Sequence, residues 1–207
     1  MKREKRGKQF YIRCVKRAID VIIASSGIIV LLVPMAIITV LIKKDSHGNA
    51  IFTQTRSGRN RKPFKILKFR TLPPDCSHYI SSNNMTEKIR LTPLQKFLRK
   101  SSIDELPQLY NVLKGDMSLI GPRPVICEET NLLCERDKYG ANDVLPGLTG
   151  WAQINGRDSL DYRKKAWLDG EYVDRISFMF DLKCFMLSIG SVLTHKGFND
   201  SFDKIKK

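Results

Sequence analysis

The chain lacks most of the residue patterns by which nucleotide- and metal-dependent enzymes are usually recognised. It contains no GxxxxGK[ST] phosphate loop, no GxGxxG dinucleotide fingerprint and no DxD metal motif. Its three histidines lie far apart, and its five cysteines form no CxxC pair, so neither a zinc cluster nor a disulfide framework is expected. These absences argue against nucleotide-binding folds of the common types and favour a folded domain in a reducing, cytosolic environment.

Basic charge is concentrated in the first third of the chain. Residues 1–70 hold 17 of the 36 Lys and Arg but only three of the 21 acids. The same third contains residues 21–42, which are 22 residues without a charge. Basic residues on both sides of an apolar segment favour an anionic membrane surface over nucleic acid, which a folded, water-facing basic patch would bind. Membrane lipids are therefore expected partners, and nucleic acid is not.

The apolar segment contains one proline. About 20 apolar residues cross a bilayer, but Pro34 divides the segment into residues 21–33 and 35–42, each too short to cross alone. Proline removes a helix hydrogen bond and bends the chain, so a re-entrant membrane helix broken at Pro34 is predicted. The basic flanks then keep both ends on the cytoplasmic side. A single, slightly kinked span remains the alternative.

After the apolar segment, the sequence predicts one α+β domain that is mainly helical. Alternation at residues 50–56 and 63–70, on either side of a Gly- and Asn-containing loop, predicts a β-hairpin. Thr92 and Pro93 predict the start of a helix that carries Leu94, Phe97 and Leu98 on one face.

The last third is predicted to begin with an ordered Gly- and Pro-rich loop at residues 144–157. A charged helix at residues 160–175 is expected to follow it. Residues 178–195 form a further apolar helix, predicted first as a core helix and second as a helix in the membrane interface.

Residues 101–124 are the most informative part of the chain. Ser102 and Glu105 have the spacing of a capping box, apolar residues then recur at helical intervals, and Gly115 predicts the helix end. Asp104 would lie in the first helical turn, where free N–H groups and the helix dipole favour an ionised carboxylate. Beside a cation-binding Glu, such a carboxylate can attack phosphorus. The pair alone is explained more simply as complementing the dipole, because first-turn acids are common.

Phosphate chemistry needs cations, and candidates surround this segment. The proline pair around Arg123 is the most informative, because fixed φ angles preorganise a guanidinium for bidentate phosphate contact. The candidate phosphate-binding cations are Lys68, Arg70, Arg99 and Arg123, and Gln153 and Arg157 are candidate phosphate- or nucleotide-binding contacts from the loop at residues 144–157.

Several motifs, taken in order, resemble those of one known family. They are KRAID at 16–20, IFTQTRSG at 51–58, FKILKFRTL at 64–72, IDELPQLYNVLKGDMSLIGPRP at 103–124 and PGLTGWAQINGR at 146–157. With them the chain resembles the bacterial sugar transferases, the small monotopic polyprenol-phosphate phosphoglycosyl transferases, from about Arg13 to His195. The resemblance implies a basic N-terminus and re-entrant membrane helix at residues 1–44 and a catalytic domain at residues 45–207. The implied location is the cytoplasmic face of the bacterial inner membrane.

The resemblance also implies a reaction and roles for individual residues. A phospho-sugar would pass from a UDP-sugar to polyprenyl phosphate, giving a polyprenyl diphosphate sugar and UMP at the start of glycan assembly. Asp104 would be the nucleophile that forms a covalent phospho-sugar intermediate, with Mg²⁺ assisting and Asp104 and Glu105 as its ligands; Glu105 would help hold this metal or handle a proton. The resemblance further implies that Arg99 and Arg123 bind phosphate and that Pro122 and Pro124 line the nucleotide site, with Lys68 and Arg70 close by. Relatives commonly carry Ser before the helix-breaking proline, where this chain has Val33. Because valine, unlike serine, cannot hydrogen-bond the backbone groups that a bend frees, the bend at Pro34 could be less sharp than in those relatives.

Two other classes of function remain open at this point. A conventional glycosyltransferase acting on a lipid-linked acceptor would release UDP rather than UMP, and a non-catalytic membrane scaffold would be indifferent to Asp104. The sequence leaves open which sugar is used, which glycan is built, and whether the protein is a homodimer.

Overall fold

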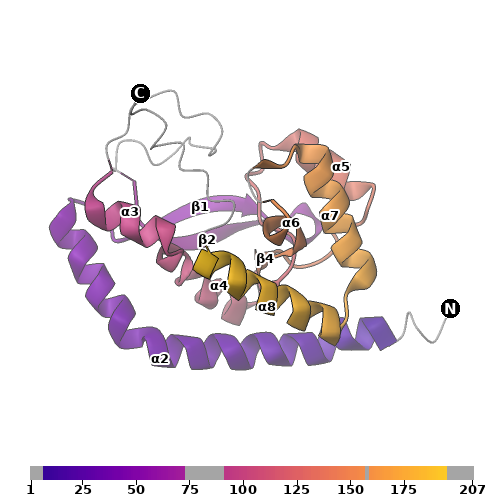
Figure 1. Ribbon diagram of the computed structural model, residues 1–207, viewed down its shortest axis with the longest axis horizontal. Helices are drawn as coiled ribbons and strands as arrows, with labels where there is room; N and C mark the ends of the chain where they lie inside the picture. The colour runs from indigo at the N-terminus through magenta and orange to yellow at the C-terminus, as the bar shows by residue number, and fades with distance from the viewer. Residues whose placement is uncertain (1–6, 73–90, 157–158, 195–207) are drawn as a thin grey trace.

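The computed structural model describes residues 7–72, 91–156 and 159–194 of the 207-residue chain. In this part of the chain, helices of very different lengths surround two separate two-stranded sheets (Figure 1). The helices are α2 (Lys16–Asp45), α3 (Pro93–Lys100), α4 (Gln108–Lys114), α5 (Thr130–Asp137), α6 (Trp151–Ile154), α7 (Tyr162–Arg175) and α8 (Phe178–Thr194). The strands are β1 (Ile51–Ser57), β2 (Pro63–Phe69), β3 (Ser118–Ile120) and β4 (Gly147–Thr149), and short turns of other helix types are η1 (Tyr11–Val15), η2 (Arg59–Arg61) and η4 (Ile103–Glu105). The predicted α+β class, mainly helical, is confirmed.

The long helix α2 continues through Pro34, and Figure 1 shows that it bends part of the way along its length. A proline inside a helix removes one backbone hydrogen bond and displaces the preceding turn, which accounts for such a bend. The predicted break therefore takes the form of a bend within one helix, not of two separate helices.

One side of α2 packs along the rest of the described chain, which we call the body (residues 46–72, 91–156 and 159–194). The side chains on this side recur every three or four residues, a spacing that keeps them on one helix face. They are Asp20, Ala24, Ile28, Leu31, Met35, Ile38 and Ile42. The first half of this stripe joins the main core around Val112 and Met117. The second half joins a smaller core with Phe69 and Leu98.

Polar contacts attach both ends of α2 to the body. At the start, Lys16 Nζ donates to Asp181 Oδ2 over 2.7 Å. Next to it, Arg17 donates to the carbonyl oxygens of Val112 (2.6 Å) and Leu113 (2.8 Å), at the C-terminal end of α4. At the far end, Thr92 Oγ1 donates to Asp45 Oδ2 over 2.9 Å. The helix is therefore fastened to the same body before and after its bend.

The two small sheets differ in burial, since every second residue of β1 is exposed and all of β3 is buried. β1 and β2 pair antiparallel, with Phe52 opposite Lys68, which confirms the predicted hairpin. β3 and β4 pair parallel, so the predicted loop at residues 144–157 contains a short strand and, after it, α6. Pairing at this distance requires glycine, because a Cβ on Gly147 would lie only 2.1 Å from the backbone N of Gly121.

The predicted helix starts had different outcomes. Thr92 and Gln95 form a capping box at the start of α3, which confirms that start, although Phe97 is exposed where a buried position was expected. The capping box predicted at Ser102 is wrong: Ser102 has a left-handed backbone, with φ of 56°, and its side chain caps nothing. The following residues form the tight turn η4, and the α-helix begins only at Gln108.

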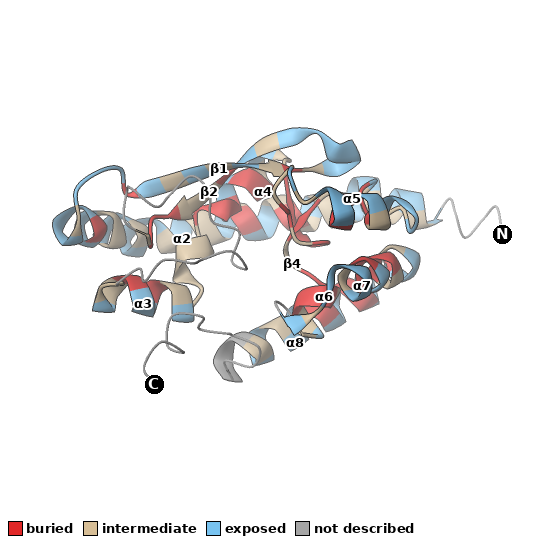
Figure 2. Ribbon diagram, turned by 90° about the horizontal axis from the view of Figure 1, so that it is seen from above, coloured by how far each residue is buried: buried red, intermediate tan, exposed pale blue. Residues whose placement is uncertain are grey.

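The helix α4 ends as predicted but buries a different set of residues. Gly115 stops it with a φ of +96°, in the left-handed conformation typical of helix ends. Tyr110 was expected on the apolar face and is exposed, whereas Gln108 and Asn111 are buried. Figure 2 shows that buried residues gather on α4, β4, α6 and α7.

Helix α8 exposes most of its apolar side chains. Only Phe180, Asp181 and Cys184 are buried among residues 178–191, so the first prediction of a core helix is wrong and the membrane-interface alternative fits better. Its exposed residues are Phe178, Met179, Leu182, Phe185, Met186, Leu187 and Ile189. On α2 the corresponding residues are Ile22, Ile23, Ile29, Val30, Leu32, Val33, Ile37, Val40 and Leu41.

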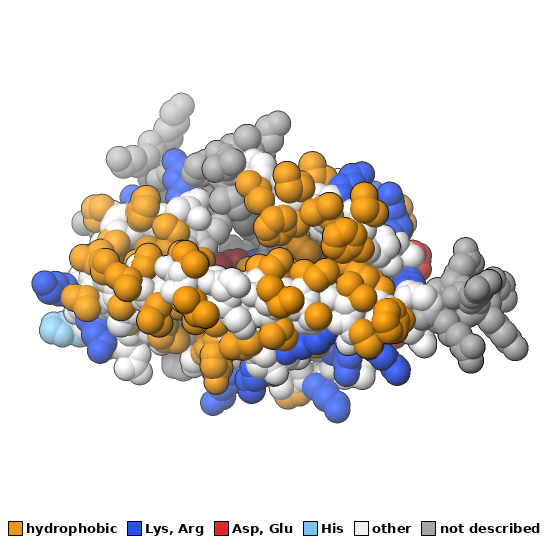
Figure 3. Space-filling model, turned by 90° about the horizontal axis from the view of Figure 1, so that it is seen from below, with side chains coloured by type: hydrophobic (Ala, Val, Ile, Leu, Met, Phe, Trp, Pro, Cys, Tyr) orange, Lys and Arg blue, Asp and Glu red, His pale blue; other side chains and the backbone are white. Residues whose placement is uncertain are grey.

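These two groups of exposed residues form what we call the apolar face. Figure 3 views the molecule from this side and shows hydrophobic side chains across it, with Lys and Arg gathered near its margins. Residues Gly7–Asp45 form a helix long and apolar enough to cross a membrane, judged by length and composition. Water-soluble monomers rarely expose an apolar patch of this extent. The apolar face is therefore consistent with association with a membrane.

Candidate active site

Asp104 and Glu105 lie together in η4, the turn that connects α3 to α4 and packs against β2. The amide N of Leu106 donates to the carbonyl oxygen of Ile103 over 3.1 Å, which closes the turn. The left-handed residue Ser102 makes this reversal of the chain feasible, because it redirects the backbone after α3. Both carboxylates are thus presented from a tight turn ahead of α4 instead of from the first turn of that helix.

Two cations from distant parts of the chain bind Glu105. Lys68 Nζ, from β2, donates to Glu105 Oε1 over 2.7 Å. Arg123 Nη2, from the loop after β3, donates to the same oxygen over 2.9 Å. The Glu105 side chain retains 14% of its exposure, so the ion pairs form in a poorly solvated place. Three of the predicted site residues are therefore brought into direct contact.

The surroundings drive the pKa values of the two carboxyl groups apart. Burial and the adjacent charge of Glu105 raise the pKa of Asp104 to about 6, against the opposing charges of Lys68, Arg99 and Arg123. Burial also acts to raise the pKa of Glu105, but the charges and hydrogen bonds of Arg123 and Lys68 outweigh it and hold that pKa well below its usual range. Paired carboxyl groups with opposite shifts are typical of reactive sites. Near neutral pH both groups are ionised beside a cluster of cations.

Buried contacts hold the elements of this site in register. The amide side chain of Asn111, on α4, accepts from Leu67 N (3.0 Å) and donates to Lys65 O (2.8 Å). It therefore pins α4 to β2 immediately before Lys68. The contacts of Arg17 with the last carbonyls of α4 fix the other end of the same helix. These contacts set the distance between Lys68 on β2 and the two acids, Asp104 and Glu105, that precede α4.

The other predicted site residues lie in different surroundings. Arg99, on α3, lies close enough for its charge to lower the pKa of Asp104. Arg70 is buried and donates to the backbone carbonyl oxygens of Ser46 and His47, so it closes the segment after α2. Gln153 is buried on α6, and Arg157 lies outside the described residues. Phosphate binding by Arg70, Gln153 and Arg157 stays a prediction.

Comparison with known proteins decides the family. The sequence pattern of the family described as Bacterial sugar transferase matches residues 11–195, from η1 through the end of α8. The chain belongs to the bacterial sugar transferase family.

Three relatives are between 32% and 43% identical to this sugar transferase over the residues that align. It is 43% identical over 160 residues to the uncharacterized sugar transferase EpsL of Bacillus subtilis, covering 77% of this chain and 78% of the relative. It is 35% identical over 190 residues to the UDP-glucose:undecaprenyl-phosphate glucose-1-phosphate transferase of Escherichia coli, covering 86% of this chain and 40% of that protein. It is 32% identical over 200 residues to the undecaprenyl-phosphate galactose phosphotransferase of Salmonella typhimurium, covering 89% and 42%. The chain thus spans less than half the length of the last two relatives.

The sequence reasoning missed one further cation of this sugar transferase at the site. Arg56, on β1, is half-buried, and its pKa is lowered to about 10 by burial first and then by the charge of Arg123. The charge of Glu105 acts on it in the opposite direction. Its guanidinium donates to Gln54 Oε1 over 2.6 Å. The sequence could have indicated Arg56 through the alternation of β1, which places residues 54 and 56 on the same side of the strand.

The site of this sugar transferase fits a magnesium ion that is shared with a substrate. Among the described residues, no group of three His, Cys, Asp or Glu side chains could hold a metal alone. Mg²⁺ is commonly bound by one or two carboxylates together with substrate phosphates. Asp104 and Glu105 are two such carboxylates, and the cations Lys68, Arg99 and Arg123 lie close enough for their charges to act on Asp104.

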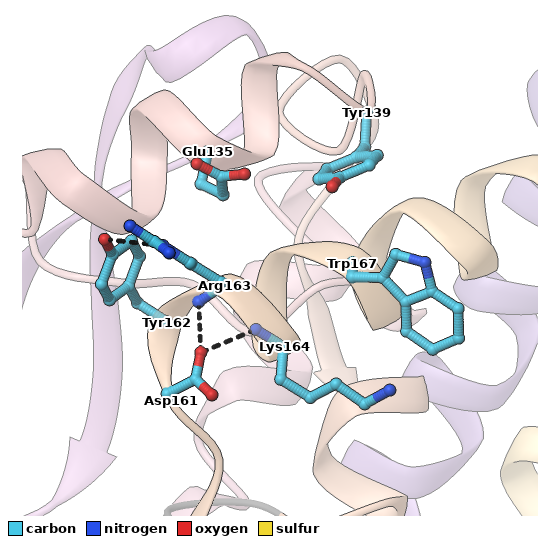
Figure 4. A pocket seen from close by; sticks show the side chains of 7 residues that line it. All are labelled: Glu135, Tyr139, Asp161, Tyr162, Arg163, Lys164 and Trp167. Carbon is cyan, nitrogen blue, oxygen red and sulfur yellow. Dashed lines mark hydrogen bonds between the residues drawn. The ribbon is translucent and has the colours of Figure 1, made fainter.

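A pocket away from this site is lined by residues of α5, of α7 and of the segments next to these two helices. It is an open pocket of about 730 Å³. Figure 4 shows its lining side chains, which are Glu135, Tyr139, Asp161, Tyr162, Arg163, Lys164 and Trp167. Asp161 Oδ1 accepts from the backbone N of Arg163 and Lys164 and so caps α7. None of the predicted site residues lines it, so the candidate active site remains the one around Asp104.

Proposed function

We propose that this sugar transferase moves a phospho-sugar from a UDP-sugar to polyprenyl phosphate, giving a polyprenyl diphosphate sugar and UMP. The observation that carries the proposal is the pair of ionisable carboxylates held against Lys68, Arg99 and Arg123. The Escherichia coli and Salmonella relatives are named as undecaprenyl-phosphate sugar phosphotransferases, which supports the proposal. The reaction starts the assembly of a glycan on its lipid carrier.

The proposed reaction has two displacements at one phosphorus atom. An Asp104 carboxylate oxygen forms a bond to the sugar-linked phosphorus, and the bond from that phosphorus to the bridging oxygen breaks, so that UMP leaves with this oxygen. A phosphate oxygen of polyprenyl phosphate then attacks the same phosphorus and displaces Asp104. Arg123 and Lys68 offset the negative charge that gathers on the phosphoryl oxygens.

Glu105 has a supporting part in this scheme. Its low pKa keeps it ionised, and its two cationic partners orient it beside Asp104. A Mg²⁺ ion held by Asp104 and Glu105 would offset charge on the diphosphate when bound. The adjacent negative charge of Glu105 also raises the pKa of Asp104, which makes the nucleophile more basic than an isolated aspartate.

We expect the first displacement to depend on pH through Asp104. Because burial and Glu105 raise its pKa to about 6, the rate of UMP release should be nearly constant above pH 7. Below about pH 6 the rate should fall roughly tenfold per pH unit, as the carboxylate becomes protonated. Glu105→Gln removes a like charge, so the pKa of Asp104 falls and the inflection moves to lower pH. The two profiles are compared by stopped assays; identical inflections would show that another group titrates.

The membrane arrangement proposed with this function is a re-entrant one. Both ends of α2 are fastened to the same body, at Lys16 and Arg17 and again at Asp45. Basic residues flank the apolar segment on both sides, including Lys43 and Lys44 in the last turn. A helix that enters and leaves on one side fits these contacts better than a span, which would separate its two ends by the bilayer. The body then lies on the cytoplasmic face.

We expect positions on either side of α2 to be reachable only from the cytoplasm. In a background in which all five cysteines are replaced, Lys5→Cys and His47→Cys provide one thiol before and one after the helix. A membrane-impermeant maleimide should label both in opened cells and neither in intact spheroplasts. A periplasmic thiol in a protein of known topology is the positive control. Labelling of position 5 in intact spheroplasts would establish a true span.

The reaction is tested by the nucleotide that is released. Purified enzyme is incubated with each member of a UDP-sugar panel, undecaprenyl phosphate and Mg²⁺, and nucleotides are separated by chromatography. UMP and a lipid diphosphate sugar are the expected products for at least one sugar. UDP as the product would indicate a conventional glycosyltransferase. No nucleotide from any UDP-sugar would reject the proposed reaction.

A further inference from the structure

Carbonyl oxygens anchor the loop that carries Arg123 to neighbouring elements. Prolines have no N–H, so within Pro122-Arg123-Pro124 only Arg123 can donate a backbone hydrogen bond. Buried carbonyl groups need donors from elsewhere. Gly147 N, from β4, donates to Pro122 O over 2.8 Å, and Ser57 N, from β1, donates to Val125 O over 2.8 Å. Backbone groups of two strands thus fix the loop on either side of Arg123.

The carbonyl oxygen of Arg123 itself is bound by a side chain. Arg136, from α5, donates through Nη1 to this oxygen over 3.1 Å. The same guanidinium donates through Nε to Asp169 Oδ2 over 2.8 Å, and its Nη2 lies 2.6 Å from that oxygen. The side chains of Arg136 and Asp169 are 6% and 1% exposed. The planar Arg136 guanidinium therefore links Asp169 on α7 to the backbone of Arg123, with Arg136 itself on α5.

A buried ion pair of this kind is weak evidence for a purely stabilising role. Removing two charges from water costs about as much as their attraction returns, and apolar residues of similar volume are often as stable. Asp169 has its pKa raised by burial, and its Oδ1 has no partner within the described residues. What an apolar pair cannot supply is a donor for the carbonyl oxygen of Arg123. The planar guanidinium, with several donors in a fixed geometry, is suited to this bridge.

We propose that Arg136, oriented by Asp169, is a positioning residue that fixes the main chain at Arg123 and so aims the Arg123 guanidinium at the transferring phosphate. This inference rests on the proposed function. The Arg123 side chain is 40% exposed, and Nη2 reaches Glu105. The prolines restrict the backbone around Arg123, and the Arg136 hydrogen bond selects one orientation of its carbonyl group. The chain of contacts runs from Asp169 through Arg136 and Arg123 to Glu105.

The test removes the bridge without leaving a buried charge. In the double variant Arg136→Met/Asp169→Leu, both partners become apolar and the carbonyl oxygen of Arg123 loses its side-chain donor. UMP release in a single turnover at saturating UDP-sugar should slow by about 10- to 100-fold, because small displacements of a positioned group reduce rates on this scale. The ion pair of Glu135 and the exposed Lys138, on and just after the same helix, provides the matched control Glu135→Gln/Lys138→Gln, which should keep the wild-type rate.

A double-mutant cycle separates positioning from general stability. If Arg136 acts through Arg123, the apolar pair added to Arg123→Ala should change the residual rate by less than about twofold. A further 10-fold loss in that background would overturn the inference, and so would a wild-type rate in the apolar pair alone. Should the apolar pair fail to fold, Arg136→Lys is used in the same cycle, because it keeps a charge opposite Asp169 but loses the planar fork.

A second measurement does not depend on activity. Hydrogen exchange of the peptide that contains residues 121–126 should become faster in the apolar pair and stay unchanged in the control. Unchanged exchange in the apolar pair would overturn the inference even if no UDP-sugar is turned over. Wild-type enzyme that releases no UMP would reject the proposed function alone, and exchange would still decide the role of Arg136.

Discussion

Asp104→Asn is expected to abolish both the covalent intermediate and turnover. The amide keeps the shape of the carboxylate in η4 but is a poor nucleophile toward phosphorus. Loss of an enzyme nucleophile commonly reduces kcat by at least about 10⁴-fold. Wild-type enzyme with UDP-sugar and Mg²⁺, without polyprenyl phosphate, should gain the mass of one phospho-sugar on the peptide that contains Asp104. The variant should gain none, as intact-protein and peptide mass spectrometry would record.

Stability provides the control for this variant. The raised pKa of Asp104 means that ionising it in the folded protein is unfavourable relative to the unfolded chain, so the stability present at low pH is lost as pH rises through about 6. The neutral Asn removes that loss, and the Tm of Asp104→Asn at pH 8 should equal or exceed that of wild type. Glu105→Gln should slow both displacements but leave the adduct on Asp104. An adduct on Glu105, or full turnover by Asp104→Asn, would reject Asp104 as the nucleophile.

Arg123→Ala should reduce turnover by at least about 10²-fold. Arg123 is held between two prolines and has a guanidinium nitrogen 2.9 Å from Glu105, so it is preorganised near the reacting phosphate. The loss should appear mainly in kcat, because the contact strengthens as charge develops on the phosphoryl oxygens. Steady-state UMP release across UDP-sugar concentrations measures both parameters.

Two comparisons sharpen the result for Arg123. Folding should survive, because the side chain is partly exposed, and circular dichroism with thermal melting would verify this. Arg163→Ala, which removes an exposed arginine in the pocket of Figure 4, serves as a control for lost surface charge. A folded Arg123→Ala enzyme with turnover equal to that control would exclude Arg123 from the active site.

Local patterns predicted the elements whose causes are local. The hairpin follows from alternation around a turn, the start of α3 from Thr92 and Pro93, and the end of α4 from Gly115. The capping box at Ser102 failed for a tertiary reason. The carboxylate of Glu105 is bound by Lys68 and Arg123, which are 37 and 18 residues away, instead of by the backbone at Ser102.

The same contrast holds for the candidate site. Lys68 and Arg123 could be proposed from the sequence because their positive charge suits phosphate, and Asp104 and Glu105 because they are adjacent carboxylates in a motif that resembles that of the family. Arg136 and Asp169 gave no such signal, since a pair 33 residues apart looks like two ordinary surface charges until the chain is folded. The role of α8 was also hard to predict, because an apolar sequence does not reveal whether protein or lipid covers it.

The attachment of α2 has a consequence for how the protein is made. This helix leaves the ribosome early, yet its polar anchors find partners much later: Arg17 is separated from Val112 by 95 residues, Asp20 from Leu119 by 99, and Lys16 from Asp181 by 165. Its side chains Ala24 and Ile42 are also part of the cores of the body. The body can therefore complete its two cores only with α2 in place, and in the proposed membrane arrangement the inserted helix would act as the template on which the remaining chain assembles. A version shortened by its first 44 residues would lack part of its own interior and should accumulate as aggregate instead of as a soluble enzyme.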